Sequence, residues 1–384
     1  MIFFSSETIE VQQPPSPGGE LAKRILDGDQ QAKEDAEIGQ ESSNQGVGSF
    51  VPSLFFENIV KSFSHAKQLY GEKLLQLITG YSGTALQKNI RLPEFKKELK
   101  AAIEQNIQKL KERQVLDENG VVQEKAHELA SMLLFLQEME QLDAKGYLGE
   151  KKAVRGSPDG DKKTARNYKK GDLYKNTAIL ETVQRAIKRG HTEICKEDLK
   201  VFDRETRGSV AVVYALDASA SMRGEKLATA KRAGVALAYK TIQQHDKIGL
   251  IVFGSEVKEA LAPTDDFHSV LSKIARVTAS QQTNVAVMIQ KAAELFPNAD
   301  KKLLLILTDA LPTAGKTPEQ DTLHAVSAAR AAGITVSLIG IGLDKFGREL
   351  AHEVARIGEG RLYSVKNLQD VDTLVLEEYE RGTS

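Results

Sequence analysis

The sequence predicts an α/β fold, a doubly wound and mostly parallel sheet, preceded by an α-helical region. Three observations predict it. From Ser209 onward, short apolar runs alternate with helical patterns, which is typical of strands joined by crossover helices. These runs contain few polar residues, as in strands that are buried on both faces. Between residues 52 and 142, by contrast, apolar residues recur at helical spacing.

The first part of the chain, residues 1–51, is expected to be a poorly ordered tail. It contains a run rich in proline and glycine at 14–19, followed by a polar stretch of Asp, Glu, Gln and Gly. Few apolar residues recur with any period, so little burial would offset the entropy cost of ordering this segment. A docking peptide for a partner is the alternative interpretation.

Residues 52–142 are predicted to form an α-helical domain. Its clearest stripe consists of Phe95, Leu99, Ile103, Ile107 and Leu110, which fall on one face of a helix. Similar apolar positions recur before it, between residues 54 and 78, and after it, between residues 129 and 139. A small bundle would bury these stripes, and a partner surface is the alternative for part of them.

Residues 143–172 are interpreted as a flexible basic linker. Glycine is frequent there, which argues against a helix or strand interior, and basic residues outnumber acidic ones. Such a segment can bind nucleic acid through phosphates, but few aromatic residues are present to stack on bases, so nucleic acid is not the expected partner. Residues 173–208 are expected to be a connector with a helix at 177–188 and a short strand within 191–202.

Residues 209–384 are predicted to form the sheet domain. Its predicted strands cover residues 210–216, 248–253, 257–261, 303–308, 334–341 and 361–365. Its predicted helices cover residues 225–243, 267–277, 285–296, 319–331, 347–357 and 368–379. The strand at 257–261 is expected at an edge of the sheet.

The composition is that of an ordinary globular protein. There are 52 basic and 53 acidic residues, so net charge gives no argument for a nucleic acid or membrane partner. The single cysteine, Cys195, excludes an intrachain disulfide. No apolar run approaches the roughly 20 residues that span a bilayer, and the N-terminus lacks the pattern of an export signal. We therefore expect a cytoplasmic location without membrane contact.

One motif stands where such folds bind ligands. Asp217, Ser219 and Ser221 follow the predicted strand 210–216 and precede a helix that begins at Glu225. In open α/β sheets, ligands bind at the carboxyl ends of the strands, near the point where strand order reverses. The alternative is a turn whose Asp and Ser side chains bind their own backbone and cap the next helix.

Two further residues favour the binding interpretation. Thr283 stands at the start of a helical pattern, and Asp309 directly follows the predicted strand 303–308. Together with Asp217, Ser219 and Ser221, this order resembles the metal-ion-dependent adhesion site (MIDAS) of von Willebrand factor A (VWA) domains, whose sheet is Rossmann-like. The resemblance covers residues 209 to about 380, less than half of the chain.

The resemblance implies a divalent cation held by these five residues. Ser219, Ser221 and Thr283 would be direct ligands, and Asp217 and Asp309 would act mainly through bound water. Hydroxyl and carboxylate oxygens are hard ligands that suit Mg²⁺ or Mn²⁺, and Ca²⁺ less well because few protein oxygens are offered. The coordination position left open would accept an Asp or Glu of a partner protein.

The region before the sheet domain carries a second resemblance. The stretch 171–194, GDLYKNTAILETVQRAIKRGHTEI, looks like that of intracellular prokaryotic VWA proteins. Members of that group often work with AAA+ ATPases of the MoxR type. The expected function is therefore a metal-dependent protein-protein interaction module, an accessory subunit and not an enzyme. A metal-dependent hydrolase and a scaffold acting through the helical region remain as alternatives.

Overall fold

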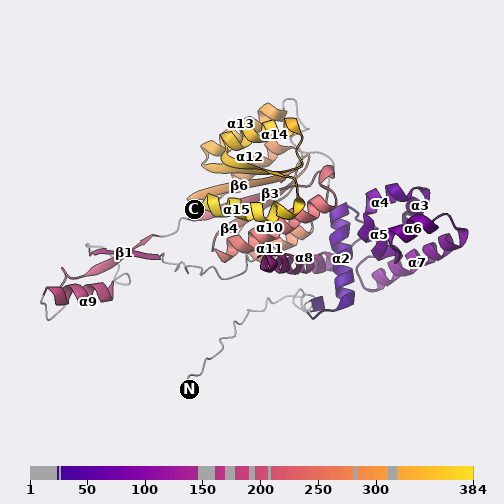
Figure 1. The fold of residues 1–384 in the computed structure, drawn as a ribbon, viewed down its shortest axis with the longest axis horizontal. Coiled ribbons are helices and arrows are strands. Elements are labelled where there is room, and N and C mark those ends of the chain that lie inside the picture. Colours follow the sequence, from indigo (N-terminus) through magenta and orange to yellow (C-terminus); the bar gives the residue numbers. More distant parts are fainter. Residues whose placement is uncertain are drawn as a thin grey trace, which may run out of the picture. The chain divides into compact units, whose positions relative to one another are not determined.

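The computed structural model describes residues 24–25, 27–145, 161–168, 178–189, 195–205, 209–279, 284–309 and 318–383 (Figure 1). The chain divides into two compact units. The first joins Met1–Lys145 with Val210–Ser384, and the second is Gly146–Ser209. Within the described ranges, no helix combines the length and the apolar character needed to cross a membrane.

A six-stranded sheet forms the centre of the larger unit. Its strands stand in the order β5-β4-β3-β6-β7-β8, and only the edge strand β5 runs antiparallel to its neighbour. The bounds are β3 Val210–Asp217, β4 Lys247–Phe253, β5 Val257–Thr264, β6 Lys301–Thr308, β7 Ile334–Ile341 and β8 Glu359–Val365. The predicted doubly wound, mostly parallel sheet is therefore confirmed.

Helices cover both faces of this sheet (Figure 1). One face packs against α10 (Glu225–Gln243), α11 (Phe267–Ala275) and α15 (Val371–Thr383), and the other against α12 (Val285–Leu295), α13 (Pro318–Ala331) and α14 (Lys345–Ile357). Strand β3 shows why its sequence is apolar throughout. Tyr214 points into the first core and its neighbours Val213 and Ala215 into the second, so both sets of side chains are buried.

The helical region consists of four short and two long helices around a core of its own. They are α3 (Pro52–Lys61), α4 (Phe63–Tyr70), α5 (Glu72–Thr79), α6 (Gly83–Asn89), α7 (Pro93–Glu112) and α8 (Glu124–Ala144). The five apolar residues of the α7 stripe are all buried, as their spacing predicts. The apolar positions between 54 and 78 lie on three helices, because Ser62 caps the start of α4 and Gly71, at φ 75°, separates α4 from α5.

Helix α8 also belongs to the core of the sheet domain. Leu134 is buried in the cluster that α10 and α11 form with the sheet. Phe135 stacks edge-on against Phe267, with ring centroids 5.4 Å apart, and lies 6.3 Å from Tyr239. Lys145 pairs with Asp372 at 2.5 Å. The helical region is thus fixed to the sheet domain through α8.

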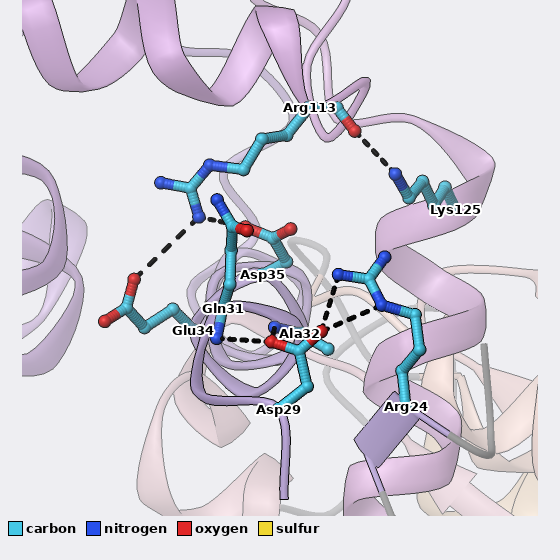
Figure 2. Close-up of polar contacts among 8 residues, drawn as sticks. All are labelled: Arg24, Asp29, Gln31, Ala32, Glu34, Asp35, Arg113 and Lys125. Carbon is cyan, nitrogen blue, oxygen red and sulfur yellow. Dashed lines mark hydrogen bonds and ion pairs between the residues drawn. The ribbon is translucent and has the colours of Figure 1, made fainter. Parts of the chain in front are cut away.

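The expectation of a poorly ordered tail through residue 51 is wrong for its second half. Residues Gln30–Gln45 form helix α2, which packs along α8. The Asp29 side chain caps the helix by accepting hydrogen bonds from the N–H groups of Gln31 and Ala32, and it pairs with Arg24 (Figure 2). Residues 1–23 lie outside the described part of the chain.

Polar contacts hold α2 against its neighbours. Arg113, at the end of α7, pairs with the buried Asp35 at 2.8 Å and reaches Glu34 at 3.8 Å (Figure 2). The Arg113 carbonyl in turn accepts a hydrogen bond from Lys125 of α8. Burial raises the pKa of Asp35 although the Arg113 guanidinium acts in the opposite direction. The helix therefore depends on specific polar partners as well as on apolar contacts.

The smaller unit corrects the interpretation of residues 143–172 as a linker throughout. Strand β1 (Asp161–Asn167) lies within that range and pairs antiparallel with β2 (Lys200–Glu205). Pairing with a distant strand, rather than local propensity, stabilises this polar segment. The connector contains helix α9 (Ile179–Lys188), where the sequence predicts one, and β2 is a strand that begins later than expected.

A candidate metal centre at the carboxyl edge of the sheet

The candidate site lies at the point where the strand order reverses. From β3 the chain adds β4 and β5 on one side, and it then returns to build β6, β7 and β8 on the other. Asp217 ends β3, and Asp309 directly follows β6, its neighbour. Parallel neighbours end at the same edge of a sheet, so the two carboxylates converge at the position where open α/β sheets bind ligands.

The Asp217 carboxylate is buried and held on both of its oxygens. Oδ1 accepts a hydrogen bond from the N–H of Ser219 at 2.8 Å, and Oδ2 accepts one from the Thr308 hydroxyl. Burial raises the pKa of Asp217 to about 6, although both hydrogen bonds act in the opposite direction. Asp217 thereby fixes the start of the loop that carries the two serines.

The two serines connect Asp217 to Asp309. The hydroxyl oxygens of Ser219 and Ser221 lie 3.0 Å apart, and the Ser221 hydroxyl donates to Asp309 Oδ1 at 2.7 Å. The short 3₁₀ helix Ala220–Met222 sets this spacing, because Ser219 is its N-cap and Ser221 is its middle residue. Four of the five predicted site residues therefore meet at one edge of the sheet.

The fifth predicted residue, Thr283, lies outside the described residues. Its neighbour Asn284 is described. The Asn284 side chain caps α12, and its N–H donates to the carbonyl of Gly254 at 2.7 Å. Gly254 follows β4, whose last residue Phe253 accepts a hydrogen bond from the Ala218 N–H. The chain next to Thr283 is thus attached to the same edge of the sheet as Asp217.

Lys226 is a part of this site that was not predicted from the sequence. Lys226 stands in the first turn of α10, and its ammonium group lies 2.5 Å from Asp309 Oδ2. The Asp309 side chain is only 2% exposed, so this ion pair is partly shielded from water. A basic residue one turn after the D-x-S-x-S loop was the available signal, but only the fold shows which carboxylate it meets.

The donors present fit a small, hard cation. They are two carboxylates and two hydroxyls, gathered within hydrogen-bond distance of one another. Within the part of the chain that the structure describes, no group of three or more His, Cys, Asp or Glu side chains could hold a metal ion. A site of the zinc type is therefore not formed by the described residues, whereas Mg²⁺ commonly takes one or two carboxylates and keeps several waters.

Replacing Lys226 by methionine is expected to increase the affinity for Mg²⁺ by about tenfold. Lys226 places a positive charge on the carboxylate that a cation would share. A unit charge and a divalent cation about 6 Å apart repel by roughly 3–6 kcal/mol at an effective dielectric constant of 20–40, and solvent screening of the partly exposed Lys226 leaves only a fraction of that energy. Isothermal titration with MgCl₂ measures the change. Lys226→Arg keeps the charge and should bind like the wild type; weaker binding by Lys226→Met would show that Lys226 chiefly holds Asp309 in place.

Comparison with known proteins finds relatives of the sheet domain. Residues 212–311 match the family model of the von Willebrand factor type A domain. An uncharacterized protein of Mycobacterium tuberculosis is 28% identical over 154 residues, which are 38% of this chain and 24% of that protein. The inter-alpha-trypsin inhibitor heavy chain 4 of Mus musculus is 28% identical over 147 residues, which are 35% of this chain and 16% of that protein. The chain thus spans a quarter or less of these relatives.

Solved structures of similar fold include two bacterial proteins. An aerotolerance-related membrane protein from Bacteroides fragilis is 23% identical, with a TM-score of 0.39. The match covers 45% of this chain and all of that chain. A von Willebrand factor type A protein from Catenulispora acidiphila is 16% identical, with a TM-score of 0.40. The match covers 46% of this chain and 43% of that chain.

Proposed function

We propose that the sheet domain is a metal-dependent protein-protein interaction module. Ser219, Ser221 and Thr283 would hold a divalent cation, Mg²⁺ in the cell. Asp217 and Asp309 would act on it mainly through bound water. The bound cation supplies a Lewis-acidic coordination position that an Asp or Glu side chain of a partner protein can take. Residues 212–311 match the family model of the von Willebrand factor type A domain. Domains of this type commonly serve protein interaction, which supports the proposal.

The observation that carries this proposal is the continuous hydrogen-bonded path from Asp217 to Asp309, which runs through the backbone N–H of Ser219 and the hydroxyls of Ser219 and Ser221. Ser219 and Ser221 lie between the two carboxylates, each within 3.0 Å of the next polar group. A turn that merely capped α10 would not need Asp309, which comes from another strand. The α10 helix is in fact capped by Gly224, without a side-chain hydrogen bond.

The partner that we propose is an AAA+ ATPase of the MoxR type, in the cytoplasm, with this chain as an accessory subunit. Support comes from the sequence resemblance of residues 171–194. The proposed role is binding and not catalysis, because a metal-dependent hydrolase also needs a general base beside the metal. The described site has two carboxylates, and both already accept hydrogen bonds. Asp217 accepts from Ser219 and Thr308. Asp309 accepts from Ser221 and Lys226.

An affinity capture from lysate of the source organism tests this function. The bait is the full chain with Mg²⁺, the full chain with EDTA, or the Asp217→Ala variant with Mg²⁺. A partner bridged by the metal is retained only in the first condition. Glu349→Ala, which removes an exposed carboxylate of α14, is the matched control and should retain the partner.

Two results would contradict the proposal. A partner retained in all conditions would place the interaction on another surface. If the captured protein were hydrolysed, or lost a covalent group, only in the presence of metal, this chain would be an enzyme and the captured protein its substrate. Identification of the retained protein by mass spectrometry tests the AAA+ assignment separately.

A further inference from the structure

The end of helix α2 contacts the loop that carries the two serines. The N–H of Gly224 donates a hydrogen bond to the carbonyl of Asn44 at 2.9 Å. Gly224 comes three residues after Ser221 and takes φ 80° and ψ −127°, a conformation that glycine adopts readily. The Asn44 carbonyl is one of the last four of α2, which find no partner within their own helix. The helical region thus satisfies a donor of the metal loop.

The Gln45 side chain packs against the same loop. A Cβ atom built on Gly224 would lie 3.3 Å from Gln45 Nε2, and one built on Gly71 would lie 2.6 Å from it. The Gln45 amide therefore lies between the α4–α5 junction and the metal loop, in a space that two glycines leave open. This contact adds to the Asn44 hydrogen bond and restricts how Gly224 can move.

The next residue, Gly46, lies beside Arg223 of the serine loop and beside Ala279, which follows α11. It ends α2 in the left-handed conformation, at φ 69°. A Cβ atom on Gly46 would lie 3.8 Å from the Arg223 guanidinium of the serine loop and 3.5 Å from the carbonyl of Ala279. Ala279 comes four residues before Thr283. The end of α2 therefore contacts two segments that lead to predicted metal ligands.

Helix α2 cannot shift freely beneath these contacts. Asp35 is paired with Arg113, and Gly39 packs so closely on α8 that a Cβ atom there would lie 2.4 Å from the carbonyl of Ala126. Helix α8 is in turn fixed to the sheet domain through Leu134 and Phe135. Close contacts thus connect the sheet domain to α8, α8 to α2, and the end of α2 to the serine loop, residues 217–224.

We propose that residues Asn44–Gly46 at the end of α2 position the serine loop, residues 217–224, so that the docking of the helical region sets the affinity of the site for its cation. This inference rests on the proposed function, since it needs a cation at the site. Coupling between two binding events is reciprocal, so a cation that tightens the loop also tightens the docking of α2. A partner that moves the helical region would thereby release or strengthen the metal-bridged contact.

The test perturbs α2 at a distance from the serine loop. Gly39→Ala must push α2 away from α8, because the new methyl group meets the backbone of Ala126. The matched control is Gly360→Ala, whose Cβ would lie 2.1 Å from the carbonyl of Val336, at the far edge of the sheet. Both variants force a backbone shift, but only the first moves α2. Titration calorimetry of the full chain with MgCl₂ gives the affinity.

We expect Gly39→Ala to bind Mg²⁺ about tenfold more weakly than the wild type, and Gly360→Ala to bind it equally well. If Gly39→Ala fails to fold, Gln45→Ala serves instead, with an expected loss of about threefold. Hydrogen exchange gives the reciprocal readout: Mg²⁺ should slow the exchange of the Gly224 N–H and of the last turn of α2.

Each outcome has a distinct meaning. If the wild type binds Mg²⁺ and both α2 variants bind it equally well, the inference is wrong and the proposed function stands. An equal loss in Gly39→Ala and Gly360→Ala would also overturn it, because the effect would then be general destabilisation. If the wild type binds no Mg²⁺, the proposed function fails and the inference fails with it.

Discussion

Replacing Asp217 by asparagine is expected to lower the affinity for Mg²⁺ by about 10- to 100-fold, the usual effect of removing a group that supports a metal's ligands. The substitution keeps the size of the side chain but removes a charge that is fully buried. An amide also cannot accept on both of its terminal atoms, so the Ser219 N–H or the Thr308 hydroxyl loses its acceptor. The charge and the position of the serine loop therefore change together.

Titration calorimetry at constant pH measures this loss, with circular dichroism to verify the fold. Asp265→Asn is the matched control, because Asp265 is an exposed carboxylate before α11 and far in sequence from the site residues. It should bind Mg²⁺ like the wild type. Unchanged binding by Asp217→Asn would contradict the assignment of Asp217 to the metal site.

The second large effect concerns Glu138, on α8 at its contact with the sheet domain. Its side chain is fully buried, and neither carboxylate oxygen has a hydrogen-bond partner among the described residues. Asp372 of α15, Arg232 of α10 and Lys145 at the end of α8 are the charged groups that act on it. Burial, with Asp372 adding to it, raises the pKa of Glu138 from 4.5 to about 7.

A raised carboxyl pKa makes the folded protein less stable as the pH rises. Below about pH 4.5 the Glu138 carboxyl is protonated in both the folded and the unfolded chain, so its full contribution to the free energy of unfolding is present. Between about pH 4.5 and 7 the unfolded chain ionises while the folded chain does not. Above about pH 7 the contribution is lost, and the difference amounts to about 3 kcal/mol in the free energy of unfolding.

Glu138→Gln should therefore remove part of the pH dependence of unfolding. We expect the variant to gain up to about 3 kcal/mol over the wild type between pH 5 and pH 8, measured by urea unfolding at both pH values. The comparison between variant and wild type is needed because burial lowers the pKa of Lys231 to about 7, which acts in the opposite sense above that pH. Glu140→Gln, on the exposed side of α8, is the control; equal behaviour of the two variants would show that Glu138 is not buried.

Much of the sheet domain could be predicted because its strands are buried on both faces. Such strands read as unbroken apolar runs, so β3 and β6 were found within one or two residues of their ends. Finding these ends also located Asp217 and Asp309. Because parallel neighbours end together, the sequence was enough to bring two carboxylates and the intervening serines to one edge of the sheet.

Helix α2 could not be predicted in this way. It buries mostly small and polar residues, and its Ser42 and Ser43 hydroxyls donate to carbonyls of their own helix. Hydrophobic periodicity does not detect such a surface, since close approach at Gly39 and the Asp35–Arg113 pair replace an apolar stripe. The contacts of Lys226 and Gln45 with the site were missed for a related reason: they depend on tertiary placement, not on spacing.

The most direct test of the metal site is anomalous diffraction from crystals grown with MnCl₂, since Mn²⁺ suits the oxygen ligands that Mg²⁺ prefers and scatters anomalously. We expect one strong peak at the edge of the sheet, about 2 Å from the hydroxyl oxygens of Ser219 and Ser221. At a Mn²⁺ concentration that just saturates the wild type, the peak should be much weaker in Asp217→Asn crystals. A peak elsewhere, or none at the serines at saturating Mn²⁺, would contradict a metal-dependent function of this edge.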